Sequence, residues 1–285
     1  MVPSAIELDG QKLIIHSARA VSGGCIHRSF YVETDQGRFF VKRNDREAQP
    51  LFRSEMDGLQ ALRQVETSLH MPRIIGMGTW QNQACLVLEW LDLVVPAQDL
   101  DWHKLAEGLA ELHCAAVGHL FGWPKPGFIG ATPQIEGLCK EWPECFLNLR
   151  LGYLWRKARE QGLGLPPFDS VFGRFENLIQ HGPQASLVHG DLWSGNVGFT
   201  RSGQPVLFDP ACYWADREVD LAMATLFGGF PKTFWATYFA CFPLPPGWQE
   251  RQKLYNLYHL LNHYLLFGGS YGASVLSSVA ELTQL

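Results

Sequence analysis

The spacing of hydrophobic and polar residues in the first ninety positions is typical of several short strands and one helix. Runs of apolar residues, many of them β-branched or aromatic, predict strands at 12–15, 30–34, 38–42, 74–75 and 85–88. The turn at 35–37 ends in a glycine and predicts that the second and third runs pair as a hairpin. Apolar residues at helical spacing predict a helix over 52–62. This part of the chain is therefore expected to form a small, mostly antiparallel lobe with one helix.

From residue 91 onward the pattern becomes mainly helical. Apolar residues recur with the helical period near 105–112, at 142–159, at 171–180 and from 219 onward, with a proline-rich break at 243–246. The stretch 118–137 holds prolines and glycines and is expected to be a long loop. Two short strands, at 187–188 and 206–208, are expected on either side of a polar loop.

Length and composition agree with a folded chain of two lobes. The chain has 285 residues, of which 47% are hydrophobic and 13% aromatic, enough to build a substantial core. We expect an α+β fold with a nucleotide-binding lobe at 1–90 and a catalytic, substrate-binding lobe at 91–285, joined near 89–92. The larger lobe is expected to be mainly helical.

Charge and cysteine content exclude several function classes. The net charge of −5 argues against a nucleic-acid partner, which usually requires an excess of basic residues. No apolar run approaches the ~18 residues of a membrane span, and the N-terminus does not resemble a signal peptide. The seven cysteines contain no CxxC pair, which favours free thiols in a reducing cytoplasm over disulfides or a zinc site.

The polar loop between the two short strands carries the residues with the clearest chemistry. His189-Gly190-Asp191 follows the first strand, Asn196 lies five positions after Asp191, and Asp209 follows the second strand. Phosphoryl transfer from a nucleotide needs a carboxylate that accepts the proton of the attacking hydroxyl, and oxygen ligands for Mg²⁺. The spacing predicts Asp191 as the catalytic base and Asn196 and Asp209 as metal ligands. The alternative is a structural Asx turn beside a buried histidine.

The predicted small lobe supplies candidate contacts for a nucleotide. Lys42 ends the second hairpin strand, where a lysine can bind phosphates, and Glu55 on the following helix can hold it in an ion pair. Gly23 and Gly24 precede the first hairpin strand, where a glycine turn lets backbone N–H groups approach phosphates. The backbone of Glu89-Trp90-Leu91, between the lobes, is expected to bind the adenine edge. Each feature alone also fits an ordinary surface charge, turn or strand end.

These residues resemble those of the fructosamine kinase, or ketosamine-3-kinase, family within the wider kinase-like and aminoglycoside-phosphotransferase-like group. His189, Asp191 and Asn196 mark the wider group. The narrower match spans roughly residues 23–272 and rests on Gly24-Cys25-Ile26, Phe40-Val41-Lys42, Gly130 with Pro133-Gln134, Arg150-Leu151, Trp193-Ser194-Gly195-Asn196, Asp209-Pro210-Ala211, residues 217–222 and residues 226–230.

The resemblance implies a bilobal protein-kinase-like fold and ATP- and Mg²⁺-dependent phosphorylation of the sugar O3 of ketosamines. These are the Amadori products of amines and sugars. The 3-phosphate is unstable and releases the amine, so the implied role is deglycation of small-molecule or protein-bound ketosamines. The resemblance also implies that Asp191 is the base, that Asn196 and Asp209 bind Mg²⁺, and that Lys42, held by Glu55, binds phosphate.

Several positions depart from the pattern of protein kinases or of the family. Gly190 stands where protein kinases carry arginine, and Asp209-Pro210-Ala211 replaces Asp-Phe-Gly with no Ala-Pro-Glu segment after it. Regulation by phosphorylation of an activation loop is therefore not expected. Trp214-Ala215-Asp216 stands where family members more often have small residues or histidine, which leaves the fine substrate preference open. Asp220 matches a family aspartate that is expected to hold the catalytic loop.

Two residues have more than one possible role. Trp193 lies beside the base and either stacks on the sugar substrate or packs in the core. Cys25, in the predicted phosphate turn, is either a redox-sensitive thiol, as in some relatives, or an inert small residue.

The alternatives to a ketosamine kinase are a kinase of another small hydroxyl substrate, such as an aminoglycoside, choline or homoserine, and a nucleotide-binding pseudokinase. A kinase of another substrate should lack the Trp193-Ser194-Gly195 segment and the block at 217–230. A pseudokinase should lack one of the four chemical residues, yet all four are present: Lys42, Asp191, Asn196 and Asp209. The preferred sugar, the amine carrier and the oligomeric state stay open.

Overall fold

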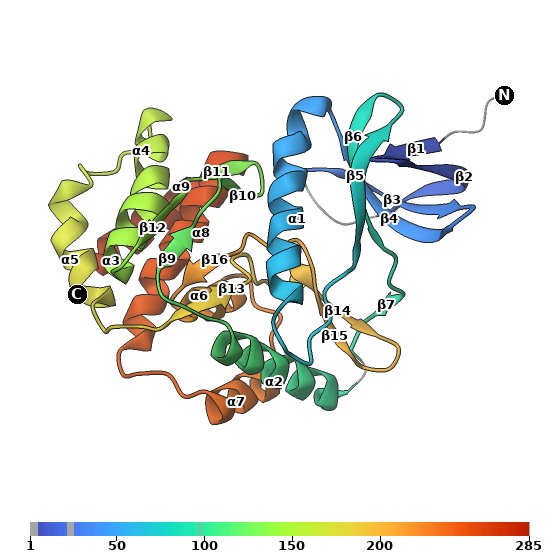
Figure 1. Cartoon of the computed structure of the whole chain (residues 1–285). Coiled ribbons are helices and arrows are strands. Elements are labelled where there is room, and N and C mark those ends of the chain that lie inside the picture. The colour runs from blue at the N-terminus through green and yellow to red at the C-terminus, as the bar shows by residue number, and fades with distance from the viewer. Residues whose placement is uncertain (1–4, 22–25, 97, 285) are drawn as a thin grey trace.

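The computed structural model describes residues 5–21, 26–96 and 98–284, which form a strand-rich N-terminal lobe and a mainly helical C-terminal lobe (Figure 1). The N-terminal lobe contains β1 (Ala5–Leu8), β2 (Gln11–Val21), β3 (Arg28–Thr34), β4 (Gly37–Asn44), the 3-10 turn η1 (Arg46–Ala48), α1 (Gln49–Arg63), β5 (Ile74–Trp80) and β6 (Gln83–Glu89). The prediction of a small antiparallel lobe with one helix is confirmed, as is the hairpin of β3 and β4.

The six strands of this lobe close into a barrel in the order β1-β2-β3-β4-β6-β5. The pattern of hydrophobic residues missed β1 and most of β2. The second half of β2 is largely exposed and lacks the alternation that a half-buried strand shows. The interior is filled by side chains with no exposed surface, namely Ile6, Leu13, Val32, Val41, Cys85 and Val87. Their burial stabilises the barrel by the hydrophobic effect, at about 1.5–3 kcal/mol for each large aliphatic side chain.

The C-terminal lobe combines helices with three small sheets. Its helices are α2 (Asp99–Ala115), α3 (Trp142–Glu144), the π-helix η2 (Cys145–Leu151), α4 (Gly152–Glu160), α5 (Asp169–Ile179), the 3-10 turn η3 (Ser194–Asn196), α6 (Glu218–Leu226), α7 (Lys232–Cys241), α8 (Trp248–Phe267) and α9 (Ser270–Leu282). Its strands are β7 (Leu93–Val94), β8 (Val117–Gly118), β9 (Phe121–Trp123), β10 (Gly127–Ile129), β11 (Thr132–Gln134), β12 (Gly137–Cys139), β13 (Ala185–Val188), β14 (Val197–Thr200), β15 (Pro205–Leu207) and β16 (Tyr213–Ala215). The predicted helices near 105–112, at 142–159 and at 171–180 are confirmed.

The prediction of a loop at 118–137 is wrong in part, because β9, β10 and β11 lie within this stretch and β12 begins at its last residue. β9 and β12 join a five-stranded sheet in the order β12-β9-β16-β13-β8, and β10 pairs with β11 as a separate hairpin. Strands of three residues are too short for a periodic pattern, and Pro133 sits in a two-stranded sheet, where an edge strand tolerates proline. The sheet matters for the site because β13 leads directly into His189.

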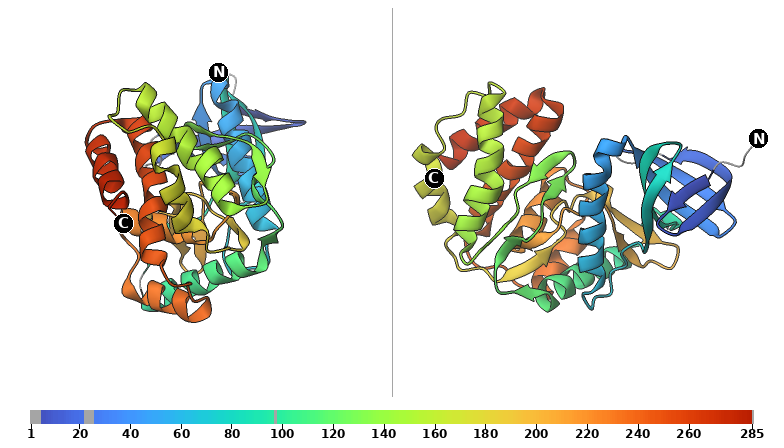
Figure 2. Two further views of the ribbon diagram at one scale, coloured as in Figure 1. Left: turned by 90° about the vertical axis from the view of Figure 1, so that its left-hand side faces the viewer. Right: turned by 45° about the horizontal axis from the view of Figure 1, so that its top comes forward.

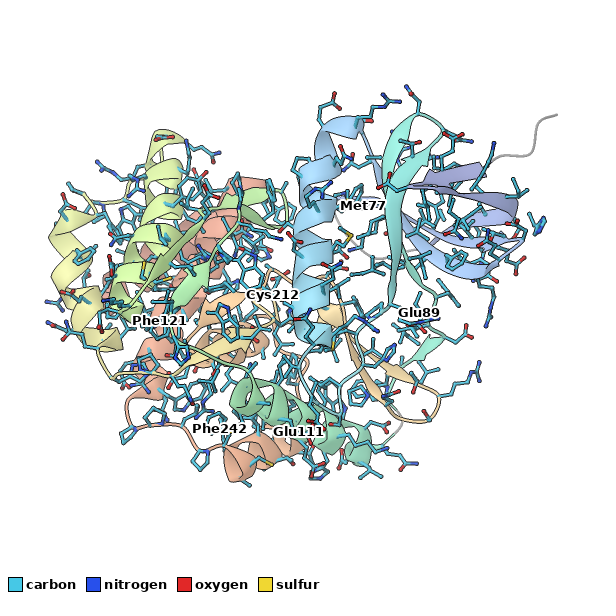
Figure 3. The ribbon with its side chains drawn as sticks, viewed as in Figure 1. Met77, Glu89, Glu111, Phe121, Cys212 and Phe242 are labelled. Carbon is cyan, nitrogen blue, oxygen red and sulfur yellow. The ribbon has the colours of Figure 1, made fainter. Side chains whose placement is uncertain are left out.

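Helix α1 stands between the barrel and the C-terminal lobe, as the right-hand view of Figure 2 shows. Figure 3 shows Cys212 of the C-terminal lobe beside this helix, where its thiol donates to the carbonyl of Gly58 at 3.6 Å. At the other side of the molecule, β7 pairs with β14 of the C-terminal lobe. The proposed lobe boundary near residue 90 stays a prediction, which this pairing supports. None of the helices among the described residues combines the length and apolar character of a membrane span.

Candidate active site

The loop that follows β13 is fixed by one buried carboxylate on α6. Asp220 accepts the backbone N–H groups of His189 at 2.7 Å and Gly190 at 2.8 Å, and His113 lies 3.2 Å from the same carboxylate. Burial acts to raise the pKa of Asp220, but the contacts with His113, His189 and Gly190 outweigh it and leave the pKa below its usual range. The role that the family resemblance implies for Asp220 therefore has a direct structural basis.

Gly190 adopts a backbone conformation that a side chain would not tolerate. Its φ is +81°, and an added Cβ would lie 2.1 Å from the carbonyl oxygen of Ala211. The N–H of Ala211 donates to the carbonyl of His189 at 2.8 Å, so the two segments are in direct contact here. The arginine that protein kinases carry at this position cannot be accommodated in this backbone.

Asp191 and Asn196 face each other across the same loop. The side-chain amide of Asn196 donates to the backbone carbonyl of Asp191 at 2.8 Å and to its carboxylate at 3.0 Å. Burial raises the pKa of Asp191 to about 7; the amide of Asn196 opposes this shift, and the charges of Asp209 and Asp220 add to it. A carboxylate with a pKa near neutrality suits a general base, because both of its protonation states are accessible.

Lys42 and Glu55 form the buried ion pair that the sequence predicted, and Asp209 joins it. The Nζ atom of Lys42 lies 2.8 Å from each carboxylate oxygen of Glu55 and also contacts the carboxylate of Asp209. Burial alone would lower the pKa of Lys42, but the two carboxylates outweigh it and raise the pKa. Asp209 has a φ of +58°, a sparsely populated conformation for a residue with a side chain and one that clusters at functional sites.

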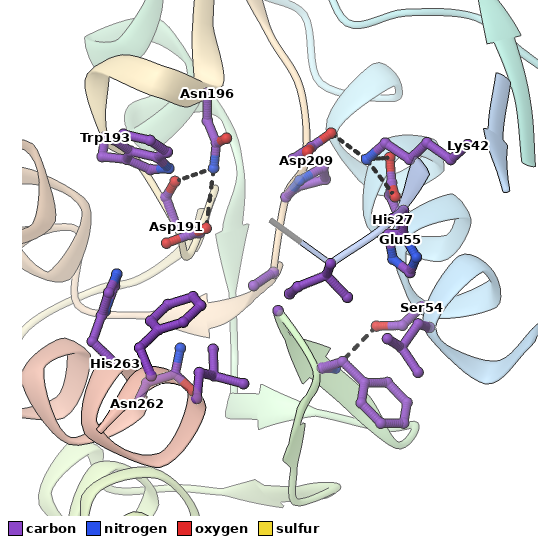
Figure 4. Close-up of a pocket in the computed structure, with 18 of the residues that line it drawn as sticks. His27, Lys42, Ser54, Glu55, Asp191, Trp193, Asn196, Asp209, Asn262 and His263 are labelled. Carbon is purple, nitrogen blue, oxygen red and sulfur yellow. Dashed lines mark hydrogen bonds and ion pairs between the residues drawn. The ribbon is translucent and has the colours of Figure 1, made fainter. Parts of the chain in front are cut away.

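These residues line one cavity between the lobes, with a volume of about 320 Å³ (Figure 4). Lys42 and Glu55 line it from the N-terminal lobe, and Asp191 and Asn196 line it from the C-terminal lobe. The amide oxygen of Asn196 points toward Asp209 across the cavity in Figure 4. A carboxylate and an amide oxygen are hard donors of the kind that Mg²⁺ prefers, so the donor set fits the predicted metal.

A second wall of the cavity comes from α8 and α9, and the sequence analysis missed it. Asn262 and His263 line the cavity, and Phe227, which directly follows α6, lies between His263 and Trp193. The rings of Trp193 and Phe227 meet edge to face at 6.2 Å, and those of Phe227 and His263 lie 4.8 Å apart. Asn262 is buried, and its Oδ1 has no hydrogen-bond partner among the described residues. The available signal in the sequence was that these two polar residues directly follow the apolar pair Leu260 and Leu261 within a helical pattern.

Trp193 is not a core residue. It is 37% exposed and lines the cavity beside Asp191. Gly195 leaves room for the indole ring, because an added Cβ there would lie 2.3 Å from it. Stacking of Trp193 on a sugar stays a prediction that this placement supports.

The predicted adenine-binding stretch lies where β6 leaves the barrel, as Glu89 shows in Figure 3. The N–H of Glu89 donates to the carbonyl of Arg73 at 2.8 Å, and its carboxylate lies 3.2 Å from His70. Trp90 packs edge to face on Tyr31, with ring centres 4.7 Å apart. The carbonyl of Leu91 accepts from the N–H of residue 93 at 3.0 Å. None of these residues lines the cavity, and their contact with a nucleotide stays a prediction.

Three residues of the sequence analysis lie outside the described part of the chain. These are Gly23, Gly24 and Cys25. The described segment that follows contributes Ile26 and His27 to the cavity. Burial and, to a smaller extent, the positive charge of Lys42 lower the pKa of His27 to about 4. This imidazole is therefore neutral at physiological pH.

Comparison with known proteins places the whole chain in one family. The profile of the family described as fructosamine kinase matches residues 4–284. A probable ketoamine kinase of Synechocystis sp. is 41% identical over 263 residues, covering 92% of this chain and 88% of that protein. The chloroplastic protein-ribulosamine 3-kinase of Arabidopsis thaliana is 33% identical over 286 residues, covering 97% and 86%.

Solved structures support the same family relationship. The crystal structure of a presumed fructosamine-3-kinase from Haemophilus somnus superposes with a TM-score of 0.88 at 27% identity, covering 96% of this chain and 94% of that one. A choline kinase from Streptococcus pneumoniae matches with a TM-score of 0.62 at 15% identity over 95% and 94%, which shows a shared protein-kinase-like fold and no more. The expected bilobal kinase-like fold is confirmed. The family profile matches nearly the whole chain, and the relatives are matched over most of their length, so the chain belongs to the fructosamine kinase family.

Proposed function

We propose that this protein is an ATP-dependent ketosamine 3-kinase that phosphorylates the sugar O3 of fructosamines, ribulosamines or erythrulosamines. The observation that carries the proposal is the meeting of two sets of residues in one cavity. The Asp191, Asn196 and Asp209 set supplies phosphoryl-transfer chemistry, and the Lys42–Glu55 pair supplies a phosphate-binding cation. The family relationship supports a ketosamine as the acceptor.

Each of these residues has a distinct task in the proposed reaction. Asp191 orients the O3 hydroxyl and accepts its proton at a carboxylate oxygen, which its raised pKa favours. Lys42, kept charged by Glu55 and Asp209, binds phosphate oxygens of the donor. Asn196 and Asp209 would hold Mg²⁺, which neutralises charge on the phosphates when bound. Positioning and electrostatics then carry the transfer, with no phosphoenzyme.

The wall formed by Trp193, Phe227, Asn262 and His263 is the proposed acceptor site. The exposed indole of Trp193 offers an apolar face to the sugar ring or chain beside Asp191. The unpartnered Oδ1 of Asn262 is a buried acceptor that a substrate hydroxyl would satisfy. Such a group discriminates strongly, because an analogue without the hydroxyl leaves it unpaired.

The 3-phosphate of the ketosamine would break down and release the amine. The proposed role of the enzyme is therefore deglycation, a form of repair. Both small-molecule and protein-bound ketosamines are proposed substrates. The relative described as a protein-ribulosamine 3-kinase supports the protein-bound class. We also propose the cytoplasm as the compartment, because the six cysteines that the structure describes are free thiols, as expected in a reducing environment.

The test is ATP-to-ADP turnover with Mg²⁺ and a panel of ribulosyl-, erythrulosyl- and fructosyl-lysine, with choline and kanamycin included. We expect turnover on at least one ketosamine and a loss of about 10²- to 10⁴-fold in Asp191→Ala. Asp169→Asn, an exposed acid in the first turn of α5, is the matched control and should keep full activity. Turnover on choline or kanamycin alone would leave the kinase-like fold assignment intact, but it would show that the enzyme acts on another acceptor.

A further inference from the structure

A hairpin of the C-terminal lobe reaches the N-terminal lobe and bonds to α1. The hairpin consists of β10 and β11, and Figure 1 shows β10 beside α1 on the face of the helix that points away from the barrel. The N–H of Phe128 donates to Ser54 Oγ at 3.1 Å, drawn as a dashed line in Figure 4. Just before the hairpin, Lys125 Nζ lies 3.1 Å from Asp57 Oδ1. We call Lys125 together with residues 127–134 the clasp.

The tip of the clasp is packed without spare room. Gly130 has a φ of +61°, and an added Cβ would lie 2.8 Å from Ile26 Cδ1 and 3.1 Å from Leu266 Cδ1. The tip therefore sits between the segment that precedes β3 in the N-terminal lobe and α8 in the C-terminal lobe. The hairpin contacts both lobes at the edge of the cavity, which Phe128 and Gly130 both line.

Both clasp contacts on α1 flank Glu55. Ser54 precedes Glu55 by one residue, and Asp57 follows it by two. A rotation or outward shift of α1 that moved Glu55 away from Lys42 would also break the bonds at Ser54 and Asp57. In protein kinases the position of the corresponding helix decides whether this lysine–glutamate pair forms, and phosphorylation of the activation loop controls that position. In this sequence Asp209-Pro210-Ala211 replaces Asp-Phe-Gly, and no Ala-Pro-Glu motif follows it.

We propose that the clasp holds α1 in the position that keeps Glu55 on Lys42, so that the ion pair is formed permanently and no activating event is needed. Ser54, Asp57 and Lys125 are then positioning residues that act through Glu55. This inference rests on the phosphoryl transfer proposed above. It assigns to the 127–134 hairpin a role in the N-terminal lobe, although the hairpin belongs to the C-terminal lobe.

The proposal predicts a specific change in kinetics. If only a fraction of the molecules keeps Glu55 on Lys42, kcat is reduced to that fraction of its full value. Loosening the clasp with Ser54→Ala and Lys125→Ala together should lower kcat about five-fold. The KM for the ketosamine should stay constant, because Trp193, Asn262 and His263 of the acceptor wall all lie in the C-terminal lobe.

A double-mutant cycle with Glu55→Gln tests whether the clasp acts through this glutamate. In the Glu55→Gln background, Ser54→Ala and Lys125→Ala together should change kcat by less than two-fold. An equal loss in both backgrounds would overturn the proposal, because the clasp would then act on another part of the enzyme. Lys157→Ala, which removes an exposed ion pair with Glu160 on α4, is the matched control and should change nothing.

Reversal of the ion pair separates positioning from general damage. Asp57→Lys and Lys125→Asp should each lower kcat, and the double swap should restore it. A second readout needs no acceptor: hydrogen exchange of the amides of α1 should be several-fold faster in the Ser54→Ala, Lys125→Ala enzyme. If the α1 amides stayed equally protected from exchange, the proposed role of the clasp would be contradicted. Failure of the unsubstituted protein to turn over any ketosamine would instead refute the proposed function, and the exchange measurement would still decide on the clasp.

Discussion

The side-chain amide of Asn196 donates twice to Asp191, to the backbone carbonyl at 2.8 Å and to the carboxylate at 3.0 Å. This contact fixes the carboxylate while the amide oxygen remains available for a metal. It also favours the charged form of Asp191, because a donor stabilises a carboxylate more than a carboxylic acid. One residue thus affects both the geometry and the protonation of the proposed base.

Asn196→Ala should therefore lower kcat by about 10²-fold or more and shift the acidic limb of the pH–rate profile to higher pH. The shift follows because the hydrogen bond that lowers the pKa of Asp191 is lost. Steady-state kinetics between pH 5.5 and 9 would measure both effects. A profile with an unchanged acidic limb would show that Asn196 does not influence the protonation of the base.

The unsubstituted enzyme should show a kcat/KM that rises with pH to a plateau above about 7. Burial raises the pKa of Asp191 to about 7, and only the ionised carboxylate accepts a proton. Below that pH the active fraction falls about ten-fold per unit. Higher Mg²⁺ concentrations should move the midpoint down, because a nearby cation favours the ionised form. An activity independent of pH between 5.5 and 8 would argue against Asp191 as the base.

Asp191→Asn should stabilise the fold while it abolishes activity. The pKa of Asp191 is raised in the folded state, so the folded state holds its proton more tightly than the unfolded chain. The resulting penalty is absent below pH 4, grows as the pH rises to about 7 and is complete above it. Removing the charge should add up to about 4 kcal/mol of stability at pH 8, or several degrees in Tm, and much less at pH 4.5. Calorimetry at both pH values would measure this, and equal Tm changes at both would contradict it.

Asp220→Asn should reduce both stability and activity. An amide cannot accept from His189 and Gly190 at once, because one of its two ends is a donor. Leaving a buried N–H unpaired costs about 1–3 kcal/mol, and the loss of the charge beside His113 adds to this. Thermal melting should show a lower Tm, and kcat should fall because Asp191 follows directly in the chain. Asp169→Asn serves again as the exposed control.

The chemistry of the site could be predicted because it lies in short segments of fixed spacing. Asp191 and Asn196 belong to one loop, so their distance along the chain limits their distance in space. The Lys42–Glu55 pair joins a strand to the helix that follows it. The predicted hairpin placed Lys42 correctly on its second strand, although β4 continues to Asn44. Asp209 joins this pair because the two lobes pack against each other. The spacing of residues along the chain could not predict that contact.

The parts that were missed depend on contacts between distant segments. The acceptor wall at Asn262 and His263 lies more than sixty residues after Trp193, and only the fold of the C-terminal lobe, in which α8 packs against α6, brings them together. Strands of two or three residues such as β8 and β9 are held by neighbours in the five-stranded sheet and not by their own propensity. Closure of the barrel likewise depends on pairing of β1 with β5, which are about seventy residues apart.

Closure of the barrel leaves each of its six strands with a partner on both sides. An open sheet presents an edge whose free N–H and C=O groups recruit further strands, from a second copy or from an unfolded chain. The N-terminal lobe presents no such edge among its described strands. Assembly or aggregation of this lobe by strand addition would first require a barrel strand to detach. The closed barrel thus protects the N-terminal lobe from growth into larger sheets.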